Sequence, residues 1–329
     1  MNPYPKEVRA KILLHRKISS DSFRLQLACP EIARSARPGQ FLMLRINELQ
    51  DPFLRRPFGF SRIFPPREKK RKPTDEGGVE ICYQIVGRGT QLMAQLPEGG
   101  RLDLLGPLGN GFWAEEGCSR VILVGGGIGV PPLLAWAQEL RRAEAGKKKL
   151  PKSPGASAEV VFLIGAKNKE KVLGAGECRR WGIEAQVATE DGGLGTQGMV
   201  TDLLEKELMT GRHSSTAIYA CGPNPMLARV AQVADQFDLP CQVLLESRMA
   251  CGVGACLGCT VKYRGELSEQ EGRERDSARS PQEPNSAAEG EERATREGAI
   301  PEISEAPPFR YARVCKEGPV FNARKIFWD

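Results

Sequence analysis

Apolar and polar positions alternate with a period of two over residues 8 to about 105, in short stretches that Gly and Pro separate. The clearest stretches are 23–27, 40–44 and 79–85. Such alternation predicts strands with one face towards a core. Many short strands with frequent turn residues between them are typical of a small antiparallel β-barrel. The charged run at 67–78 is expected to form a hairpin insertion within this barrel.

The pattern changes near residue 120, where continuous apolar runs replace the alternation. The runs 121–124, 160–164 and 217–220 have the length of buried strands. Apolar residues at helical spacing follow the first run, at Leu133, Leu134, Ala137 and Leu140. Buried strands that alternate with helices predict a doubly wound α/β domain with a parallel sheet.

A third kind of sequence begins near residue 241, where a cysteine-rich segment precedes a long charged stretch. Residues 264–308 contain no aromatic residue and are dense in Glu, Arg, Ser and Pro. Such a composition buries too little apolar surface to offset the entropy of ordering, so we expect a disordered insertion at about 265–308. The expected organisation is a barrel at 1–112, an α/β domain at 113–240 and a small C-terminal domain at 241–329.

Composition and charge narrow the functional classes. Of 329 residues, 40% are hydrophobic and 27% charged, as in ordinary soluble proteins. No apolar run reaches the roughly 20 residues that cross a bilayer, and residues 1–17 do not resemble a signal peptide, so we expect a cytoplasmic protein without membrane contact. The net charge of +6 includes local runs such as 67–72 and 147–149, which lack interleaved aromatic residues for stacking bases. We therefore expect no nucleic-acid partner.

Four of the ten cysteines have the spacing of an iron–sulfur site. Cys251, Cys256 and Cys259 follow the pattern C-x4-C-x2-C, and Cys315 stands far downstream, as in plant-type [2Fe–2S] proteins. Glycines between them permit close backbone approach to sulfur. The long gap does not disqualify Cys315, because each doubling of loop length costs only ~0.6 kcal/mol. The alternatives are a zinc site with four cysteine ligands and a set of unliganded thiols.

Two glycine-bearing turns indicate a dinucleotide site. The sequence GGGIGVPP at 125–132 follows a buried strand and opens a helix, an arrangement that suits a pyrophosphate at the helix N-terminus. Val130 replaces the third glycine of the strict pattern, so a plain strand-to-helix turn is the alternative. A second turn at 221–227 follows another buried strand at the same sheet edge. Candidate cofactor-binding residues here are Gly127, Gly129, Cys221, Gly222 and Pro223; Cys221 either faces the nicotinamide or fills a strand end.

A nicotinamide site and an iron–sulfur site in one chain imply a flavin. Nicotinamide exchanges two electrons as hydride, whereas a cluster takes one, and a flavin connects the two. The barrel is therefore expected to hold FAD or FMN. An arginine can bind phosphate as a bidentate fork, and a Gly-x-Gly-Thr turn offers backbone donors. The alternative at each position is an ordinary barrel hairpin with a surface arginine. The candidates are Arg56, Pro57, Phe58, Gly59, Gly87, Gly89 and Thr90.

The order of these motifs resembles the ferredoxin-reductase-like superfamily, and most closely the electron-transfer subunit of type B dihydroorotate dehydrogenase. The likeness rests on 56–59, 87–90, 125–133, 221–226, 246–259 and 315–321. The resemblance implies a partner subunit that carries FMN and oxidises dihydroorotate to orotate in pyrimidine biosynthesis, in a heterotetramer with two of each subunit. Electrons would pass from that FMN through the [2Fe–2S] cluster and FAD to NAD.

The resemblance also implies roles for single residues. Arg56 would hold the FAD pyrophosphate, Phe58 would lie against the flavin, and Gly89 and Thr90 would line the cofactor. The turn at 190–193 is similar to the family's acidic turn near the NAD ribose. Two positions depart from the family. Gly59 stands where Ser or Thr is usual, so a backbone N–H or Ser61 would have to serve the flavin, and Gly193 replaces a serine.

No residue of this chain is expected to abstract a proton from dihydroorotate, so this chemistry is expected in the partner subunit. His15 and His213 lie outside the motifs and are expected at the surface. Two other functions stay open: an NAD(P)H-dependent reductase subunit of another redox complex, and a zinc-stabilised nucleotide-binding module. Lys167 and Lys169 follow the second buried strand of the α/β domain and are either partners for the 2′-phosphate of NADP or solvated loop charges. The choice between NAD and NADP therefore stays open.

Overall fold

A computed structural model of the chain describes residues 4–46, 51–67, 73–144, 159–211, 215–265 and 309–328. The predicted disordered insertion at about 265–308 lies outside the described residues except for Gly265, and His213 lies outside them too.

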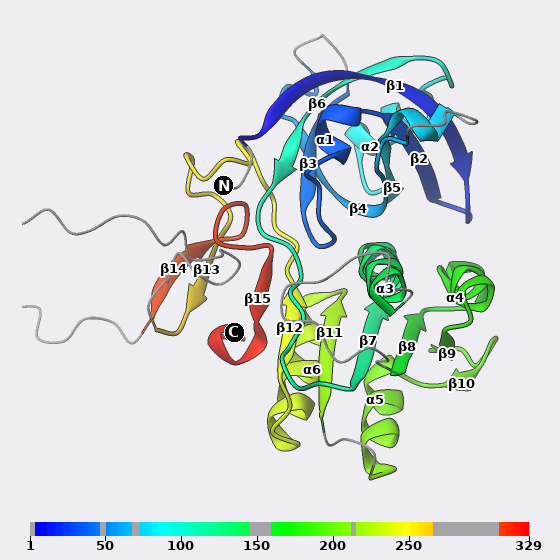
Figure 1. Ribbon diagram of the computed structural model, residues 1–329, viewed down its shortest axis with the longest axis vertical. Coiled ribbons are helices and arrows are strands. Elements are labelled where there is room, and N and C mark those ends of the chain that lie inside the picture. Colours follow the sequence, from blue (N-terminus) through cyan, green and yellow to red (C-terminus); the bar gives the residue numbers. More distant parts are fainter. Residues whose placement is uncertain are drawn as a thin grey trace, which may run out of the picture.

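The N-terminal part is the predicted antiparallel barrel (Figure 1). Its six strands close in the order β1-β2-β5-β4-β3-β6. Leu25, Phe60 and Ile81 are fully buried inside it, so the period-two alternation identified the inner face. The elements are β1 (Lys6–Lys17), β2 (Ser22–Ala28), α1 (Pro30–Ala33), β3 (Phe41–Arg45), β4 (Arg56–Phe64), η1 (Pro73–Glu76), β5 (Gly78–Gln84), α2 (Arg88–Met93) and β6 (Arg101–Leu108).

The second part is a doubly wound sheet, also as predicted. Seven strands have the order β10-β9-β8-β7-β11-β12-β15, and all neighbouring pairs are parallel except β12 with β15. The elements are β7 (Arg120–Gly126), η2 (Gly127–Gly129), α3 (Val130–Glu144), β8 (Glu159–Ala166), η3 (Lys169–Lys171), α4 (Ala175–Trp181), β9 (Glu184–Thr189), β10 (Thr196–Gln197), α5 (Val200–Met209), β11 (Thr216–Cys221), α6 (Asn224–Gln236), β12 (Cys241–Leu244), β15 (Val320–Asn322) and η4 (Ala323–Lys325).

The strand order reverses between β7 and β11. From β7 the chain proceeds to β8, β9 and β10 on one side, and then returns to β11 and β12 on the other. Ligands bind open α/β sheets at such a switch point, beyond the carboxyl ends of the strands. Both predicted nucleotide turns follow these two strands. None of the described helices is long and apolar enough to cross a bilayer.

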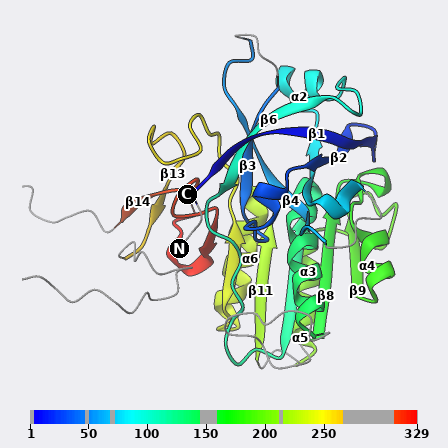
Figure 2. The same cartoon turned by 45° about the horizontal axis from the view of Figure 1, so that its top comes forward.

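The cysteine segment lies beside both the barrel and the seven-stranded sheet (Figure 2). Strands β13 (Thr260–Tyr263) and β14 (Arg310–Arg313) pair with each other, on either side of the insertion. Strand β15 then pairs antiparallel with β12, so the last strand of the chain forms one edge of the seven-stranded sheet, the nucleotide sheet. Asn110, in the connection that leaves the barrel, donates to the carbonyls of Glu317 and Val320 at 2.9 and 3.0 Å. The segment is thus held by both neighbours.

The seven-stranded sheet and its helices form the nucleotide unit. The barrel contacts this unit chiefly where β4 of the barrel packs against α3. A side-chain carbon at Gly59 would lie 3.3 Å from Cγ of Pro132, at the start of α3. Farther out, Lys171 Nζ lies 2.5 Å from Oδ1 of Asp21, in the turn before β2. Hydrogen bonds from Lys171 and then Gln84 hold the pKa of Asp21 well below its usual value of 3.8. This carboxylate therefore links the two units in its ionised form.

Replacement of Asp21 by asparagine should reduce stability in a pH-dependent way. Because folding lowers the pKa of this carboxyl, its stabilising effect is fully present above the unfolded-state value near 3.8 and is lost as the pH falls towards the folded-state value. Chemical denaturation at several pH values should show a difference between wild type and variant that is constant above about pH 5 and shrinks below pH 4. The same change at Asp235, whose side chain is 70% exposed, is the control and should have a smaller effect. A constant difference down to pH 2 would contradict the assignment.

Candidate functional site

The four predicted cluster cysteines come together as two pairs. Cys251 hydrogen-bonds with Cys256, and Cys259 hydrogen-bonds with Cys315. Cys256 is exposed, whereas Cys259 and Cys315 are each 2% exposed. Among the described residues, no three His, Cys, Asp or Glu side chains surround a site for a single metal ion. Four cysteine sulfurs in two neighbouring pairs fit the ligand set of a dinuclear cluster, with one pair for each iron.

Backbone donors surround the first cysteine pair. The Val253 N–H lies 3.4 Å from Sγ of Cys251. Burial alone would raise the pKa of Cys251, but hydrogen bonds from the backbone of Val253, Cys256 and Ala255 outweigh it and lower the pKa to about 6. Burial and the Cys259 thiol raise the pKa of Cys315 to about 12. The thiolates of an iron–sulfur cluster accept hydrogen bonds from nearby backbone N–H groups, so the geometry of this loop suits the predicted cluster.

Contacts with the barrel and with β14 hold the cysteine loop in shape. A side-chain carbon at Gly252 would lie 2.5 Å from Cγ of Met43 in β3, so the loop rests directly on the barrel. Arg313 Nη1 donates to the Gly254 carbonyl at 2.9 Å, and its Nε donates to Glu317 at 2.9 Å. Arg313 thus connects the loop that carries three cysteines to the turn that carries the fourth.

The two nucleotide turns touch each other at the switch point. A side-chain carbon at Gly129 would lie 2.3 Å from the carbonyl oxygen of Cys221 and 2.6 Å from the backbone nitrogen of Gly222. One at Gly126 would lie 3.1 Å from Cδ of Pro223. The glycines therefore let two backbone segments meet, and their position above neighbouring strands is that of a dinucleotide site.

Cys221 is buried at the end of β11. Burial raises the pKa of its thiol well above the usual value, so the thiol is neutral. Gly127 has a φ of +54°, and a side-chain carbon there would have open space around it. The structure thus places Gly127 at the open side of the turn and the Cys221 side chain within the core cluster under α3.

The predicted flavin residues lie in β4 and at the start of α2. Arg56 is half-buried, and a side-chain carbon at Gly89 would lie 2.9 Å from its Nε. The Thr90 hydroxyl accepts from the Val86 N–H at 2.9 Å and donates to the Gly87 carbonyl at 3.0 Å. Arg56 and the Gly87–Thr90 turn therefore share one place, where a guanidinium and close backbone suit a pyrophosphate.

The next residues of β4 face different surroundings. Phe58 packs edge-on against Tyr83, with ring centroids 5.9 Å apart. Ser61, which we considered as a substitute for the usual hydroxyl at position 59, is buried and donates to Glu80 at 3.0 Å. His15 is half-buried: Nε2 lies 2.9 Å from the Tyr83 hydroxyl, and Nδ1 lies 2.8 Å from the Leu96 carbonyl. Tyr83 of β5 and the segment between α2 and β6 thus hold a histidine that we expected at the surface.

The predicted acidic turn at 190–193 lies at the same edge of the sheet as the two nucleotide turns. Glu190 N–H donates to the Ala166 carbonyl at 3.1 Å, and Asp191 accepts from the Gly193 N–H at 2.8 Å. The turn therefore lies beyond the carboxyl ends of β8 and β9. Beside it a groove of about 410 Å³ opens against α4. Its lining is mostly apolar: Ala175, Arg179, Ile183, Ala185, Val187, Leu194 and Gly195.

Comparison with known proteins assigns the family. The iron–sulfur cluster binding domain of dihydroorotate dehydrogenase B matches residues 246–273, and the oxidoreductase NAD-binding domain matches residues 123–232. The electron-transfer subunit of dihydroorotate dehydrogenase B (NAD(+)) from Desulforamulus reducens is 33% identical over 322 residues, which cover 97% of this chain and 98% of the relative. The chain belongs to this family. The corresponding subunit of Caldanaerobacter subterraneus subsp. tengcongensis is 32% identical, over 98% of this chain and 99% of the relative.

Solved structures agree on the fold of this family member. An NADH-dependent reduced ferredoxin-NADP oxidoreductase has a TM-score of 0.69 at 24% identity, covering 98% of this chain and 91% of that one. A ferredoxin NADP+ reductase from Neisseria gonorrhoeae, solved with FAD and NADP, has a TM-score of 0.55 at 16% identity, covering 70% and 91%. The barrel, the nucleotide sheet and their order along the chain are therefore those of the reductase fold.

Proposed function

We propose that this chain passes electrons from the FMN of a partner subunit, which oxidises dihydroorotate to orotate, to NAD+ in the synthesis of UMP. FAD and one [2Fe–2S] cluster are its cofactors. When bound, the flavin supplies the exchange between hydride and single electrons, and the cluster carries one electron at a time. The chain is an oxidoreductase subunit, and the chemistry on dihydroorotate belongs to the partner. We place the complex in the cytoplasm, as a heterotetramer with two copies of each subunit.

The chain's own residues bind, orient and shield these groups. Arg56 and the turn from Gly87 to Thr90 hold the FAD pyrophosphate, with Pro57, Phe58 and Gly59 along the flavin. The turns at Gly127–Gly129 and 221–223 hold NAD. Cys251, Cys256, Cys259 and Cys315 hold the cluster. The corresponding functional parts are 1–112 for FAD, 113–240 for NAD and 241–329 for the cluster.

The observation that carries the proposal is the pairing of cysteines next to a reductase fold. Cys251 with Cys256 and Cys259 with Cys315 form two sulfur pairs, on a loop that rests on the barrel through Gly252 and Met43. A one-electron site that contacts the proposed flavin unit directly is what an electron relay needs.

Cofactor analysis of the purified full-length chain, prepared without air, tests the proposal. We expect one FAD, two irons and two acid-labile sulfides per chain, a brown-yellow colour, and bleaching of the flavin absorbance by NADH. Orotate formation from dihydroorotate and NAD+ should require both this chain and its FMN partner. A colourless protein that contains zinc would contradict the proposal and favour a nucleotide-binding module. A coloured protein that supports another acceptor but no orotate formation would favour a different reductase complex.

Replacement of Arg56 by lysine should weaken FAD binding about tenfold or more, because an ammonium group cannot reproduce the bidentate fork of a guanidinium on phosphate. Titration of the apoprotein with FAD, followed by flavin fluorescence, measures the dissociation constant. Arg101→Lys in β6, at an exposed position of the barrel, is the matched control and should bind FAD like wild type. Equal affinity in all three proteins would show that Arg56 does not hold the cofactor.

A further inference from the structure

The outer face of the barrel carries a buried carboxylate. In β5, Val79 and Ile81 are fully buried in the barrel core, so Glu80 between them points to the opposite face. Its side chain is nevertheless only 2% exposed. Removing a carboxylate from water is costly unless donors replace its hydration. The surroundings of Glu80 therefore have to supply those donors.

Residues of the two strands that flank β5 meet at Glu80. Gln26 Nε2 donates to it at 2.8 Å, and the Ser61 hydroxyl donates at 3.0 Å. Arg24 Nε and Arg62 Nε lie 3.6 and 3.8 Å from Oε1. In the sheet, Gln26 and Arg62 are the direct cross-strand partners of Glu80, on β2 and β4. Glu80 thus connects both neighbours of β5.

A β-bulge in β4 brings two consecutive side chains to Glu80. The register of β4 against β5 shifts between Phe60 and Arg62. In a regular strand, Ser61 and Arg62 would point to opposite faces, whereas a bulge changes the direction of one of them. The bulged residue Ser61 is two positions after Gly59, so the contact with Glu80 lies close to the proposed flavin residues of β4.

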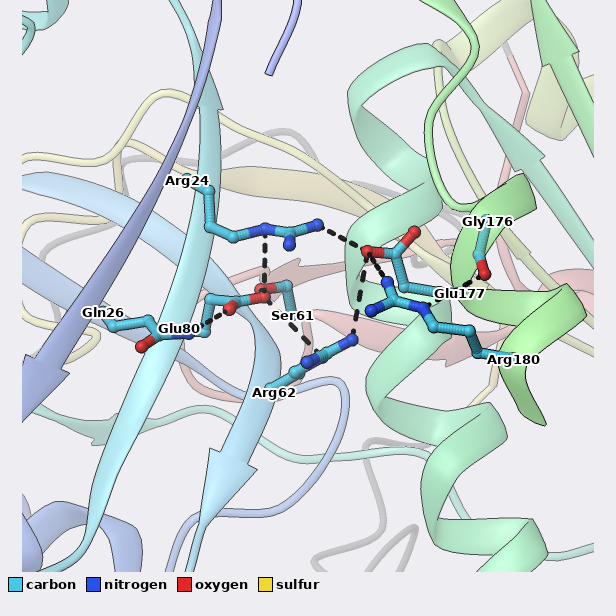
Figure 3. A network of polar contacts seen from close by, with 8 residues as sticks. All are labelled: Arg24, Gln26, Ser61, Arg62, Glu80, Gly176, Glu177 and Arg180. Carbon is cyan, nitrogen blue, oxygen red and sulfur yellow. Dashed lines mark hydrogen bonds and ion pairs between the residues drawn. The ribbon is translucent and has the colours of Figure 1, made fainter. Parts of the chain in front are cut away.

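A second carboxylate faces this group from the nucleotide unit (Figure 3). Glu177 lies in α4, and its side chain is 9% exposed. Arg24 Nη2 donates to it at 2.6 Å, Arg180 Nη2 lies 3.1 Å away, and Arg62 Nη2 lies 3.9 Å away. Burial alone would raise the pKa of Glu177, but the hydrogen bond and charge of Arg24 lower it below its usual value. Arg24 and Arg62 therefore each reach both carboxylates, one in each unit.

The position of α4 is coupled to the nucleotide turn. A side-chain carbon at Gly174, just before α4, would lie 2.7 Å from Cγ1 of Val130. Val130 directly follows Gly129, and Pro132 of the same helix contacts Gly59 of β4. The first turn of α3 is thus enclosed between the flavin strand and α4.

We propose that Glu80, Glu177, Arg24 and Arg62 form a clamp of positioning residues, which fixes the nucleotide unit against β4 at the distance that hydride transfer requires. The clamp extends the proposed function and rests on it. Hydride transfer demands reacting atoms about 3–3.5 Å apart. Apolar contacts are not directional and permit sliding. The charge-assisted hydrogen bond from Arg24 to Glu177 is directional, and the ion pairs of Arg24 with Glu80 and of Arg62 with both carboxylates, at 3.6–3.9 Å, add attraction across the same contact.

The experiment compares Glu177→Gln and Arg24→Lys in the full-length holoprotein. Stopped-flow reduction of the flavin by NADH should slow about tenfold in both, because displacement by a fraction of an ångström impairs hydride transfer, while the dissociation constant of NADH changes little. Arg24→Lys keeps the charge, but it loses the rigid planar fork with which the guanidinium reaches both carboxylates. Hydrogen–deuterium exchange, which does not depend on activity, should increase in peptides that cover 56–64 and 170–181.

Glu205→Gln is the matched control, because Glu205 pairs with Arg229 between α5 and α6, within the nucleotide unit alone. It should leave the reduction rate and the exchange of both peptides unchanged. Wild-type rates and exchange in both clamp variants would overturn the clamp, as would an equal decrease in the control. A wild-type protein whose flavin NADH cannot reduce would instead overturn the proposed function, and the exchange data would still decide whether the clamp holds the two units together.

Discussion

Replacing Cys256 with serine is expected to abolish electron exchange with the FMN partner and to preserve the reduction of an artificial dye by NADH. The change removes one of the four proposed sulfur ligands from an exposed position, so it disturbs the barrel and the nucleotide sheet little. Loss of the cluster would lower the dihydroorotate-dependent reduction of NAD+ by about 100-fold or more, since even changes beyond the ligands cost about 10–100-fold. The dye reaction needs only NADH and FAD.

The measurements are iron content, visible absorbance and the two activities on the same preparation. Cys118→Ser, a substitution of a buried cysteine outside the cluster segment, is the control and should keep the iron, the cluster absorbance and both activities. Full partner-linked activity in Cys256→Ser, with iron absent, would refute the relay through the cluster.

Replacing Gly129 with alanine is expected to weaken NADH binding strongly and to leave FAD and the cluster in place. The added carbon would lie 2.3 Å from the carbonyl oxygen and 2.5 Å from the carbonyl carbon of Cys221. Both are backbone atoms, so no side-chain rotation relieves the clash, and the two nucleotide turns must separate. Such overpacking costs about 3 kcal/mol, which corresponds to a roughly 100-fold loss of NADH affinity.

Gly176→Ala provides the matched control for this substitution. Gly176 lies in α4 with nothing within 4 Å of the added carbon, so alanine there should be neutral or stabilise the helix by up to about 1 kcal/mol. NADH binding by fluorescence quenching and the melting temperature distinguish the two variants. NADH affinity equal to wild type in Gly129→Ala would show that the turns do not form the dinucleotide site.

Local periodicity was sufficient to predict the fold class. In the barrel, alternate residues such as Leu25 and Ile81 face one core, so a period of two was visible without any tertiary information. In the nucleotide sheet, β7 and β11 are covered on both faces, which makes them continuous apolar runs. The comparisons and the structure confirm the resulting barrel, doubly wound sheet and cluster segment.

The parts that the sequence did not reveal depend on contacts between distant segments. The spacing of Cys251, Cys256 and Cys259 indicated candidate ligands, but the pairing of Cys259 with Cys315 depends on how β14 returns beside β13. Glu80 occupies the polar face of an alternating strand, and side chains of the neighbouring strands β2 and β4 surround it. His15 was expected at the surface because its partners, in other parts of the barrel, leave no local pattern.

The pairing of β13 with β14 has a consequence for how this protein tolerates change. Tyr263 pairs with Arg310, so the chain leaves the folded segment and re-enters it at neighbouring points. The span that these two residues delimit can therefore lengthen or shorten, or accept a fused tag, without altering the separation of Cys259 and Cys315. A change of length at this point is then neutral for electron transfer, and the site is the natural place to graft a reporter.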